Sequence, residues 1–204
     1  MGKIQGESMV EFVCICGIDG VGKTTIAKEL AKRLGYIYVK TPPQSYQTIR
    51  EHYEHEGVSA FSRFCFYLGA LYESSERIRT TLRLGQGVVV DRYLLSVQVY
   101  HEAMIKRDLG RFIELVDFVK PDLNIILQAS MATVAKRLKD RGNHTFDHKL
   151  ENNESFLNKV AEKFATKTEG SAHIICDNKS IDDVVEECLT LISKAEQSYE
   201  ERKQ

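Results

Sequence analysis

Residues 12–25 read FVCICGIDGVGKTT, an apolar run that ends in glycines, a lysine and two threonines. The part from Gly17 to Thr24 satisfies the pattern G-x-x-x-x-G-K-[ST]. The run from Val10 to Cys16 predicts a strand buried on both faces. After Gly22, apolar residues recur every four positions, which predicts an amphipathic helix ending near residue 35. A glycine-rich loop between a buried strand and a helix is the arrangement that binds a nucleotide phosphate.

The residue types of this loop explain why a phosphate would bind there. Glycines let backbone N–H groups turn toward one anion, and the start of the helix adds its dipole. Lys23 is expected to reach the β- and γ-phosphates, and the hydroxyl of Thr24 to bind Mg²⁺. The nucleotide-binding residues expected in the loop are Gly17, Asp19, Gly20, Val21, Gly22, Lys23, Thr24 and Thr25.

A second polar site follows the apolar stretch VVV at residues 88–90. Asp91 ends this expected strand, where a carboxylate can face the phosphates and help Thr24 to hold Mg²⁺. Arg92 is always charged and can donate two N–H groups to a phosphate. We therefore expect both residues at the phosphate site.

Short apolar strands alternate with amphipathic helices along the rest of the chain. This pattern predicts an α/β fold of the P-loop NTPase type: a five-stranded parallel sheet with helices on both faces, in one domain spanning residues 1–204. Strands are expected at 10–16, 36–39, 88–90, 123–127 and 173–176, and further helices at 59–84, 95–107, 111–119, 131–141, 151–167 and 181–194. The polar stretch from Gly142 to Lys149 predicts a loop, and we expect a lid at about 142–150.

Composition excludes several classes of protein. The 204 residues carry a formal net charge of −1, which argues against a nucleic-acid binder. No apolar run is long enough to cross a membrane, and the first residues lack the apolar core of a secretion signal. The five cysteines form no metal-type pairs, so we interpret them as small buried hydrophobes in a reducing compartment. A cytoplasmic protein is expected.

A phosphate loop alone also fits GTP switches, ATPase motors and phosphotransferases. The guanine-reading motif N-K-x-D is absent, because Asp177-Asn-Lys-Ser180 has no aspartate in the fourth place. A chain of 204 residues leaves little room for motor machinery. A small kinase with a mobile lid is favoured.

Three motifs in order carry a family resemblance: GIDGVGKTT at 17–25, DRY at 91–93 and PDLN at 121–124. With them the chain resembles the thymidylate kinase family, from about residue 10 to 192. The resemblance implies a nucleoside monophosphate kinase that uses ATP and Mg²⁺, with dTMP as the expected acceptor. It also implies a homodimer formed through long helices, of which 59–84 would be one.

The resemblance also assigns roles to single residues. Arg92 corresponds to the arginine that contacts the acceptor and transferred phosphates, and Asp19 to an acid that contacts the acceptor's sugar. Lys40 would lie near the acceptor phosphate, Phe66 would stack on thymine, and Arg137 would contact ATP. The sugar and base pocket would include Ser96, Tyr100 and His101.

Three departures from the family pattern leave alternatives open. His101 follows Tyr100 where the family has a glutamine. Ala70 stands where the family has a base-reading arginine, so weak discrimination among pyrimidines is expected. In the lid, Lys149 replaces an arginine, and Arg141 or Arg137 could supply the catalytic cation instead. The alternatives are a kinase of the same fold that acts on another nucleotide, nucleoside or small molecule, and a nucleotide-binding regulatory protein with little transfer activity.

Overall fold

The computed structural model describes residues 10–53, 57–140, 144–166 and 170–201. Its core is a sheet of five strands in the order β2-β3-β1-β4-β5, and every neighbouring pair is parallel. The expected fold class is confirmed. The strands are β1 (Phe12–Gly17), β2 (Ile37–Lys40), β3 (Val88–Asp91), β4 (Leu123–Gln128) and β5 (Ser171–Ile175).

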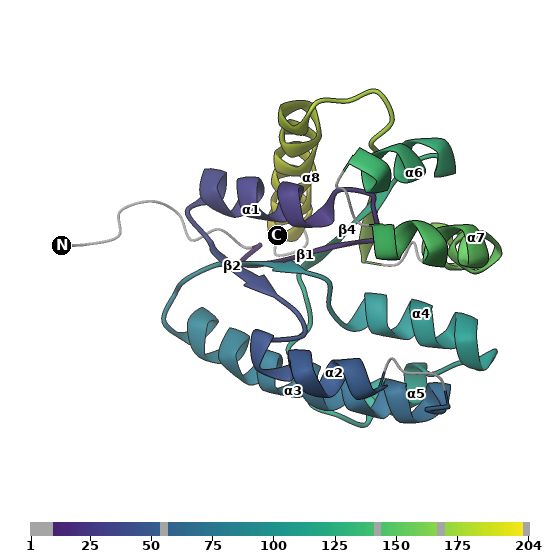
Figure 1. The fold of residues 1–204 in the computed structure, drawn as a ribbon. Helices are drawn as coiled ribbons and strands as arrows, with labels where there is room; N and C mark the ends of the chain where they lie inside the picture. The colour runs from purple at the N-terminus through teal and green to yellow at the C-terminus, as the bar shows by residue number, and fades with distance from the viewer. Residues whose placement is uncertain (1–9, 54–56, 141–143, 167–169, 202–204) are drawn as a thin grey trace.

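Helices connect the strands and cover both faces of the sheet, as parallel pairing requires. In Figure 1, α1 and α8 lie over one face, and α3 and α4 lie under the other. The helices are α1 (Lys23–Leu34), α2 (Gln47–Tyr53, after a 3₁₀ turn at Gln44–Tyr46), α3 (Ala60–Arg83), α4 (Leu94–Ile105), α5 (Gly110–Glu114), α6 (Met131–Asp140), α7 (His144–Ala165) and α8 (Ile181–Glu201). No helix in the described part of the chain is long and apolar enough to cross a membrane.

Three helix boundaries differ from those expected. The loop expected at 142–149 is wrong from His144 onward, where α7 begins. The sequence from 144 to 165 contains neither glycine nor proline, so nothing in the backbone interrupts the helix. Helix α5 ends at Glu114 rather than near 119, because the chain leaves the helix to bury Phe118 in the core. Helix α8 continues beyond 194 to Glu201, since Tyr199 still packs against the core.

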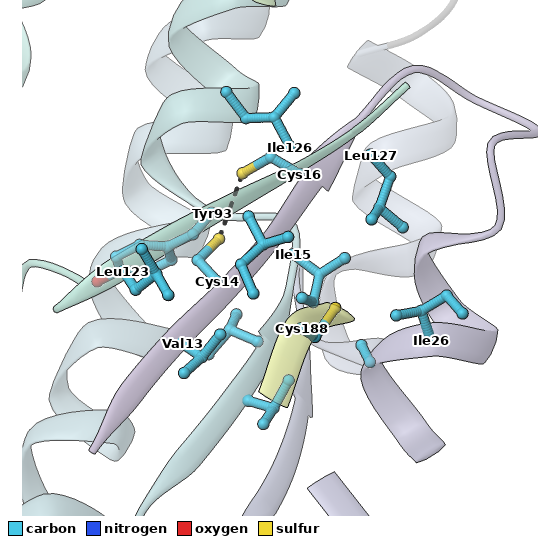
Figure 2. Close-up of a cluster of buried hydrophobic side chains, with 14 of the residues drawn as sticks. Val13, Cys14, Ile15, Cys16, Ile26, Tyr93, Leu123, Ile126, Leu127 and Cys188 are labelled. Carbon is cyan, nitrogen blue, oxygen red and sulfur yellow. Dashed lines mark hydrogen bonds between the residues drawn. The ribbon is translucent and has the colours of Figure 1, made fainter. Parts of the chain in front are cut away.

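Strand β1 runs through the centre of the core and is buried along its whole length. Successive side chains point to opposite faces of the sheet. In Figure 2, Cys14 and Cys16 lie together on the side of Tyr93, and their sulfur atoms are 3.4 Å apart. Ile15 lies on the other side, near Cys188 of α8. Four cysteines are buried as expected, but Cys65 on α3 is exposed.

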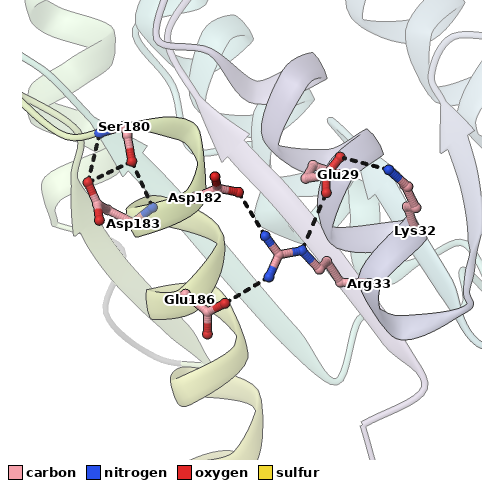
Figure 3. A network of polar contacts seen from close by, with 7 residues as sticks. All are labelled: Glu29, Lys32, Arg33, Ser180, Asp182, Asp183 and Glu186. Carbon is pink, nitrogen blue, oxygen red and sulfur yellow. Dashed lines mark hydrogen bonds and ion pairs between the residues drawn. The ribbon is translucent and has the colours of Figure 1, made fainter.

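A network of charged side chains links α1 to α8 at the surface (Figure 3). The guanidinium of Arg33 donates to Asp182 at 2.7 Å and to Glu186 at 2.8 Å. Solvent screens such exposed pairs, so they position the two helices more than they stabilise the fold. At the start of α8, the backbone N–H of Asp183 donates to Ser180 Oγ, and that of Ser180 donates to the Asp183 carboxylate. This reciprocal capping box fixes the start of α8.

Candidate active site

The phosphate loop joins β1 to α1 and depends on two glycines for its shape. Gly17 has φ +135°, and a Cβ there would lie 2.5 Å from the carbonyl oxygen of Leu127. Gly20 has φ +81°, and a Cβ would lie 2.9 Å from side-chain atoms of Val134 and Leu138 on α6. Both the left-handed backbone and the close approach exclude larger residues. Strand β4 and helix α6 therefore hold the loop from behind.

Lys23 occupies the centre of this loop. Its side chain is buried, and Nζ donates to the carbonyl oxygen of Ile18 at 2.6 Å. Burial and the nearby charge of Arg92 lower the pKa of Lys23 to about 7, although Asp19 and Asp91 act in the opposite direction. A phosphate in the loop would raise this pKa again, because it adds negative charge. The ammonium is held where the loop can present it to an anion.

Thr24 and Asp91 meet beside the loop, as predicted for a Mg²⁺ site. The Thr24 hydroxyl donates to Asp91 Oδ2 at 2.5 Å, and the hydroxyl of Tyr38 donates to the same oxygen at 3.3 Å. The other carboxylate oxygen, Oδ1, is buried and accepts no hydrogen bond from any described residue. A buried carboxylate oxygen without a donor suits a cation, and oxygen ligands suit Mg²⁺. These two residues therefore fit the predicted ion.

Arg92, Asp19 and Tyr100 form a connected group next to Lys23. Arg92 donates to the Asp19 carboxylate, and the Tyr100 hydroxyl donates to the other oxygen of that carboxylate at 3.1 Å. The guanidinium also lies 5.3 Å from the centre of the Tyr100 ring. Burial alone would raise the pKa of Asp19, but Arg92, Lys23 and Tyr100 outweigh burial and hold the pKa at about 2. Asp19 is therefore ionised and fixes Arg92 in place.

One cavity of about 390 Å³ extends from the phosphate loop into the space between α3 and α4. Of the predicted site residues, it brings together Asp19, Gly20, Gly22, Lys23, Thr24, Lys40, Asp91, Arg92, Ser96, Tyr100 and His101. The other described residues that line it are Thr41, Pro42, Arg50, Arg63, Tyr67, Leu71, Val97 and Met104. Its two ends differ in character: the loop end is charged, and the helix end combines aromatic and apolar side chains with Arg63 and His101.

The wall formed by α3 uses different residues from those predicted. Tyr67 and Leu71 line the cavity, whereas Phe66 and Ala70 do not. The Phe66 ring stacks on Tyr53 of α2, with centroids 4.6 Å apart, and Ala70 is fully buried. Neighbouring residues on a helix point about 100° apart, so a shift of one position changes the face entirely. The cavity lining therefore includes Tyr67 in place of the expected Phe66.

The wall formed by α4 follows the prediction. Ser96, Tyr100 and His101 all line the cavity, with Val97 between them. His101 is buried, and its Nδ1 lies 2.7 Å from the carbonyl oxygen of Val97, one turn earlier. Burial lowers the pKa of His101, an effect that outweighs this hydrogen bond. The imidazole is therefore neutral at pH 7.

Sequence reasoning missed two arginines that line the cavity, Arg50 on α2 and Arg63 on α3. Arg63 precedes Tyr67 by four residues and Leu71 by eight, so all three share one helix face. This spacing is visible in the sequence. If Tyr67 had been assigned to the pocket, the same spacing would have predicted Arg63 there as well. Arg50 gave no comparable signal, because only the packing of α2 against α3 brings it to the cavity.

The remaining predicted residues lie behind or beside the cavity. Gly17 and Val21 shape the loop, and Thr25 is exposed on α1, outside the cavity lining. Arg137 donates to the carbonyl oxygen of Val21 at 2.7 Å and to that of Cys176 at 2.9 Å. It therefore ties the phosphate loop to the end of β5. Two predicted site residues remain. Arg141 lies outside the described residues, and Lys149 lies in α7, where the structure does not describe its side chain.

Comparison with known proteins agrees with this geometry. A family model described as thymidylate kinase matches residues 15–188. A probable thymidylate kinase of Methanococcus aeolicus is 30% identical, over 89% of this chain and 95% of that protein. A probable thymidylate kinase of Archaeoglobus fulgidus is also 30% identical, over 89% and 94%.

Solved structures share the fold. Thymidylate kinase from Candida albicans matches with a TM-score of 0.74 at 21% identity, over 91% of this chain and 93% of that one. Deoxyadenosine kinase from M. mycoides matches with a TM-score of 0.68 at 22% identity, over 89% and 99%. The match to the family model spans most of the chain, and the phosphate loop, Asp91 and Arg92 lie together at one cavity. The chain belongs to the thymidylate kinase family.

Proposed function

We propose that this protein transfers the γ-phosphoryl group of ATP to dTMP, giving ADP and dTDP. The observation that carries the proposal is the single cavity that joins the phosphate loop to the space between α3 and α4. Lys23 lies at one end and Tyr67 at the other, with Arg92 on the lining as well. A donor nucleotide at the loop and an acceptor between the helices would place their phosphates toward each other. Family membership supports the same reaction.

The chemistry follows from this arrangement. An oxygen of the acceptor's phosphate attacks the γ-phosphorus, and the bond from that phosphorus to the β,γ-bridging oxygen breaks, so ADP leaves with the electron pair. Such a reaction needs positioning and positive charge rather than a covalent intermediate. Lys23 and Arg92 would provide the charge. Thr24 and Asp91 would hold Mg²⁺, which when bound neutralises charge on the β- and γ-phosphates.

Asp19 acts through Arg92 in this scheme. Its carboxylate accepts from both Arg92 and Tyr100, so it holds the guanidinium toward the cavity. Lys40 also lines the cavity and would contact the acceptor's phosphate. The acceptor is thus expected to be held at its phosphate by Lys40 and Arg92.

The segment around the start of α7 is proposed as the lid. Arg141 and Lys149 fall in it and would bring a further cation to the transferred phosphoryl group. Closure would exclude water, which would otherwise hydrolyse ATP. Arg137 is less suited to this role, because both of its terminal nitrogens donate to backbone carbonyls.

We also expect a cytoplasmic homodimer. Exposed apolar side chains on α3 and α5, namely Phe61, Tyr72 and Phe112, support an interface on that side of the molecule. Light scattering coupled to gel filtration would give twice the chain mass. A monomer at micromolar concentration would contradict the homodimer and leave the reaction untouched.

A coupled assay for ADP production tests the proposed reaction. The purified protein, ATP and Mg²⁺ are combined in turn with dTMP, dCMP, dAMP, thymidine and deoxyadenosine. We expect acceptor-dependent turnover with dTMP above that with the other compounds. If turnover occurred only with a nucleoside or with another monophosphate, that compound would be the acceptor instead of dTMP. ATP binding without turnover on any acceptor would support a regulatory nucleotide-binding protein instead.

A further inference from the structure

The helix end of the cavity contains one histidine whose tautomer is fixed by its surroundings. Nδ1 of His101 lies 2.7 Å from the Val97 carbonyl oxygen, which can only accept a hydrogen bond. Nδ1 therefore carries the proton. Because the ring is neutral, Nε2 has a lone pair and can only accept. The tautomer follows from contacts within α4 and does not depend on any ligand.

This acceptor is buried and has no donor among the residues that the structure describes. His101 is 3% exposed, and its Nε2 has no hydrogen-bond partner there. Because Nδ1 faces the Val97 carbonyl, Nε2, which is separated from Nδ1 by Cε1, faces away from that carbonyl. His101 lines the cavity, and its ring lies 5.5 Å from that of Tyr67 on α3. A buried acceptor without a donor costs free energy unless a ligand supplies one.

Arg63 provides the opposite chemistry on the facing wall. It lies one helical turn before Tyr67 and lines the same cavity. A guanidinium has five N–H groups and accepts nothing, so it pairs with oxygen atoms. Its charge also acts on His101, whose pKa it helps to lower after the larger effect of burial. The cavity thus presents a donor from α3 and an acceptor from α4 beside one aromatic ring.

We infer that Arg63 and His101 together read the acceptor's base and select one that has a ring N–H between two carbonyl groups, as thymine and uracil have. The N–H would donate to His101 Nε2, and a neighbouring carbonyl oxygen would accept from Arg63. Cytosine presents a lone pair at the same ring position and would leave His101 without a donor. This inference rests on the proposed function and deepens it, because it names the residues that would choose the acceptor. It also replaces the expectation, based on Ala70, of weak discrimination among pyrimidines. Arg63 would supply the missing donor from another turn of the same helix.

The test measures base preference by binding and by turnover separately. Isothermal titration without ATP gives the affinities for dTMP and dCMP, and the coupled assay gives kcat/KM for both. The variants are Arg63→Met, which keeps an unbranched apolar stem, and His101→Phe, which keeps a flat ring beside Phe64. The controls are Arg77→Met on the outer face of α3 and His52→Phe on α2, two exposed positions outside the cavity lining.

The wild-type protein should prefer dTMP to dCMP in both measurements. Each cavity variant should lose roughly 10- to 100-fold in affinity for dTMP, with little change for dCMP, because a buried polar group loses its partner. Both controls should keep the wild-type preference. Circular dichroism verifies that each variant folds. If His101→Phe does not fold, Arg63→Met alone is sufficient to test the inference.

The two possible failures are distinguishable. If dTMP binds preferentially and the cavity variants abolish that preference, the inference stands even when no acceptor is phosphorylated, and only the proposed reaction fails. If dTMP is phosphorylated but Arg63→Met keeps the full preference over dCMP, the inference is overturned and the reaction stands. Equal affinity of the wild-type protein for dTMP and dCMP would also overturn it.

Discussion

The two ends of the cavity differ in how the chain builds them. The phosphate end consists of one continuous loop, the first turn of α1 and the end of β3. Its contacts include Lys23 to the Ile18 carbonyl and Thr24 to the Asp91 carboxylate. The base end consists of side chains from α3 and α4, which meet only when the two helices pack. The phosphate end depends on local sequence and on the register of the sheet. The base end depends on which face of α3 is turned toward α4. Substitutions at the phosphate end should therefore lower turnover or stability, and those at the base end should lower the affinity for dTMP.

The largest effect is expected from removing charge at the phosphate end. Lys23→Ala and Arg92→Ala should each lower kcat by orders of magnitude, because each removes positive charge from the transferring phosphoryl group. Steady-state kinetics with dTMP would measure this, with Lys32→Ala, an exposed lysine on the same helix as Lys23, as the control. Near wild-type turnover in either variant would show that the phosphate end has been assigned to the wrong residues.

Backbone contact at the phosphate end can be tested with a glycine pair. Gly20→Ala should destabilise the fold by ~2 kcal/mol, because it adds left-handed strain and a clash with Val134 and Leu138. Gly35→Ala has the same kind of φ but no atom within 4 Å of the added Cβ, so it isolates the strain. Urea unfolding gives both values. Equal losses would mean that α6 does not hold the loop.

The base end can be tested with two adjacent aromatic residues on α3. Tyr67→Ala should weaken dTMP binding by about tenfold, because Tyr67 lines the cavity and a stacked ring contributes ~1–3 kcal/mol. Phe66→Ala should change dTMP affinity little, since its ring packs on Tyr53 instead. Titration calorimetry compares the two. If Phe66→Ala bound dTMP more weakly than Tyr67→Ala, the placement of Tyr67 rather than Phe66 beside the acceptor would be wrong.

The smallest effect is expected in the acid stability of the Asp19–Arg92 pair. The pKa of Asp19 falls from 3.8 to about 2 in the folded protein, so the unfolded state binds more protons as the pH drops. The stabilisation is fully present above pH 3.8 and is lost as the pH falls through about 2. Asp19→Asn should therefore be less stable than the wild-type protein at pH 5, and the difference should shrink toward pH 2. Urea midpoints across this range measure it, and a constant difference would contradict the pairing.

The sequence was sufficient to predict the sheet and the geometry of the phosphate loop. A G-x-x-x-x-G-K-[ST] loop between an apolar run and a helix fixes its own geometry, and its binding groups are contiguous in the chain. Parallel strands end at one edge of the sheet, so Asp91 had to come near Thr24. The contact between these two residues confirms that argument. Local residues and one rule of sheet topology were enough.

Helix boundaries were less predictable because polar residues form helix and loop alike. The stretch 144–149 has no apolar pattern, yet it is the start of α7. Likewise, the end of α5 depends on burial of Phe118, which no local pattern encodes. Propensity is a weak guide where packing decides.

The sequence by itself determined the fold, the phosphate loop and the meeting of Thr24 with Asp91, because these depend on backbone shape and strand order. Only the tertiary structure decided which face of α3 meets α4. Aromatic residues occur on more than one face of that helix, at 61, 64, 66 and 67, so their pattern could not choose between Phe66 and Tyr67. Packing turned Phe66 toward α2 and Tyr67 toward His101, and with Tyr67 it brought Arg63 to the cavity.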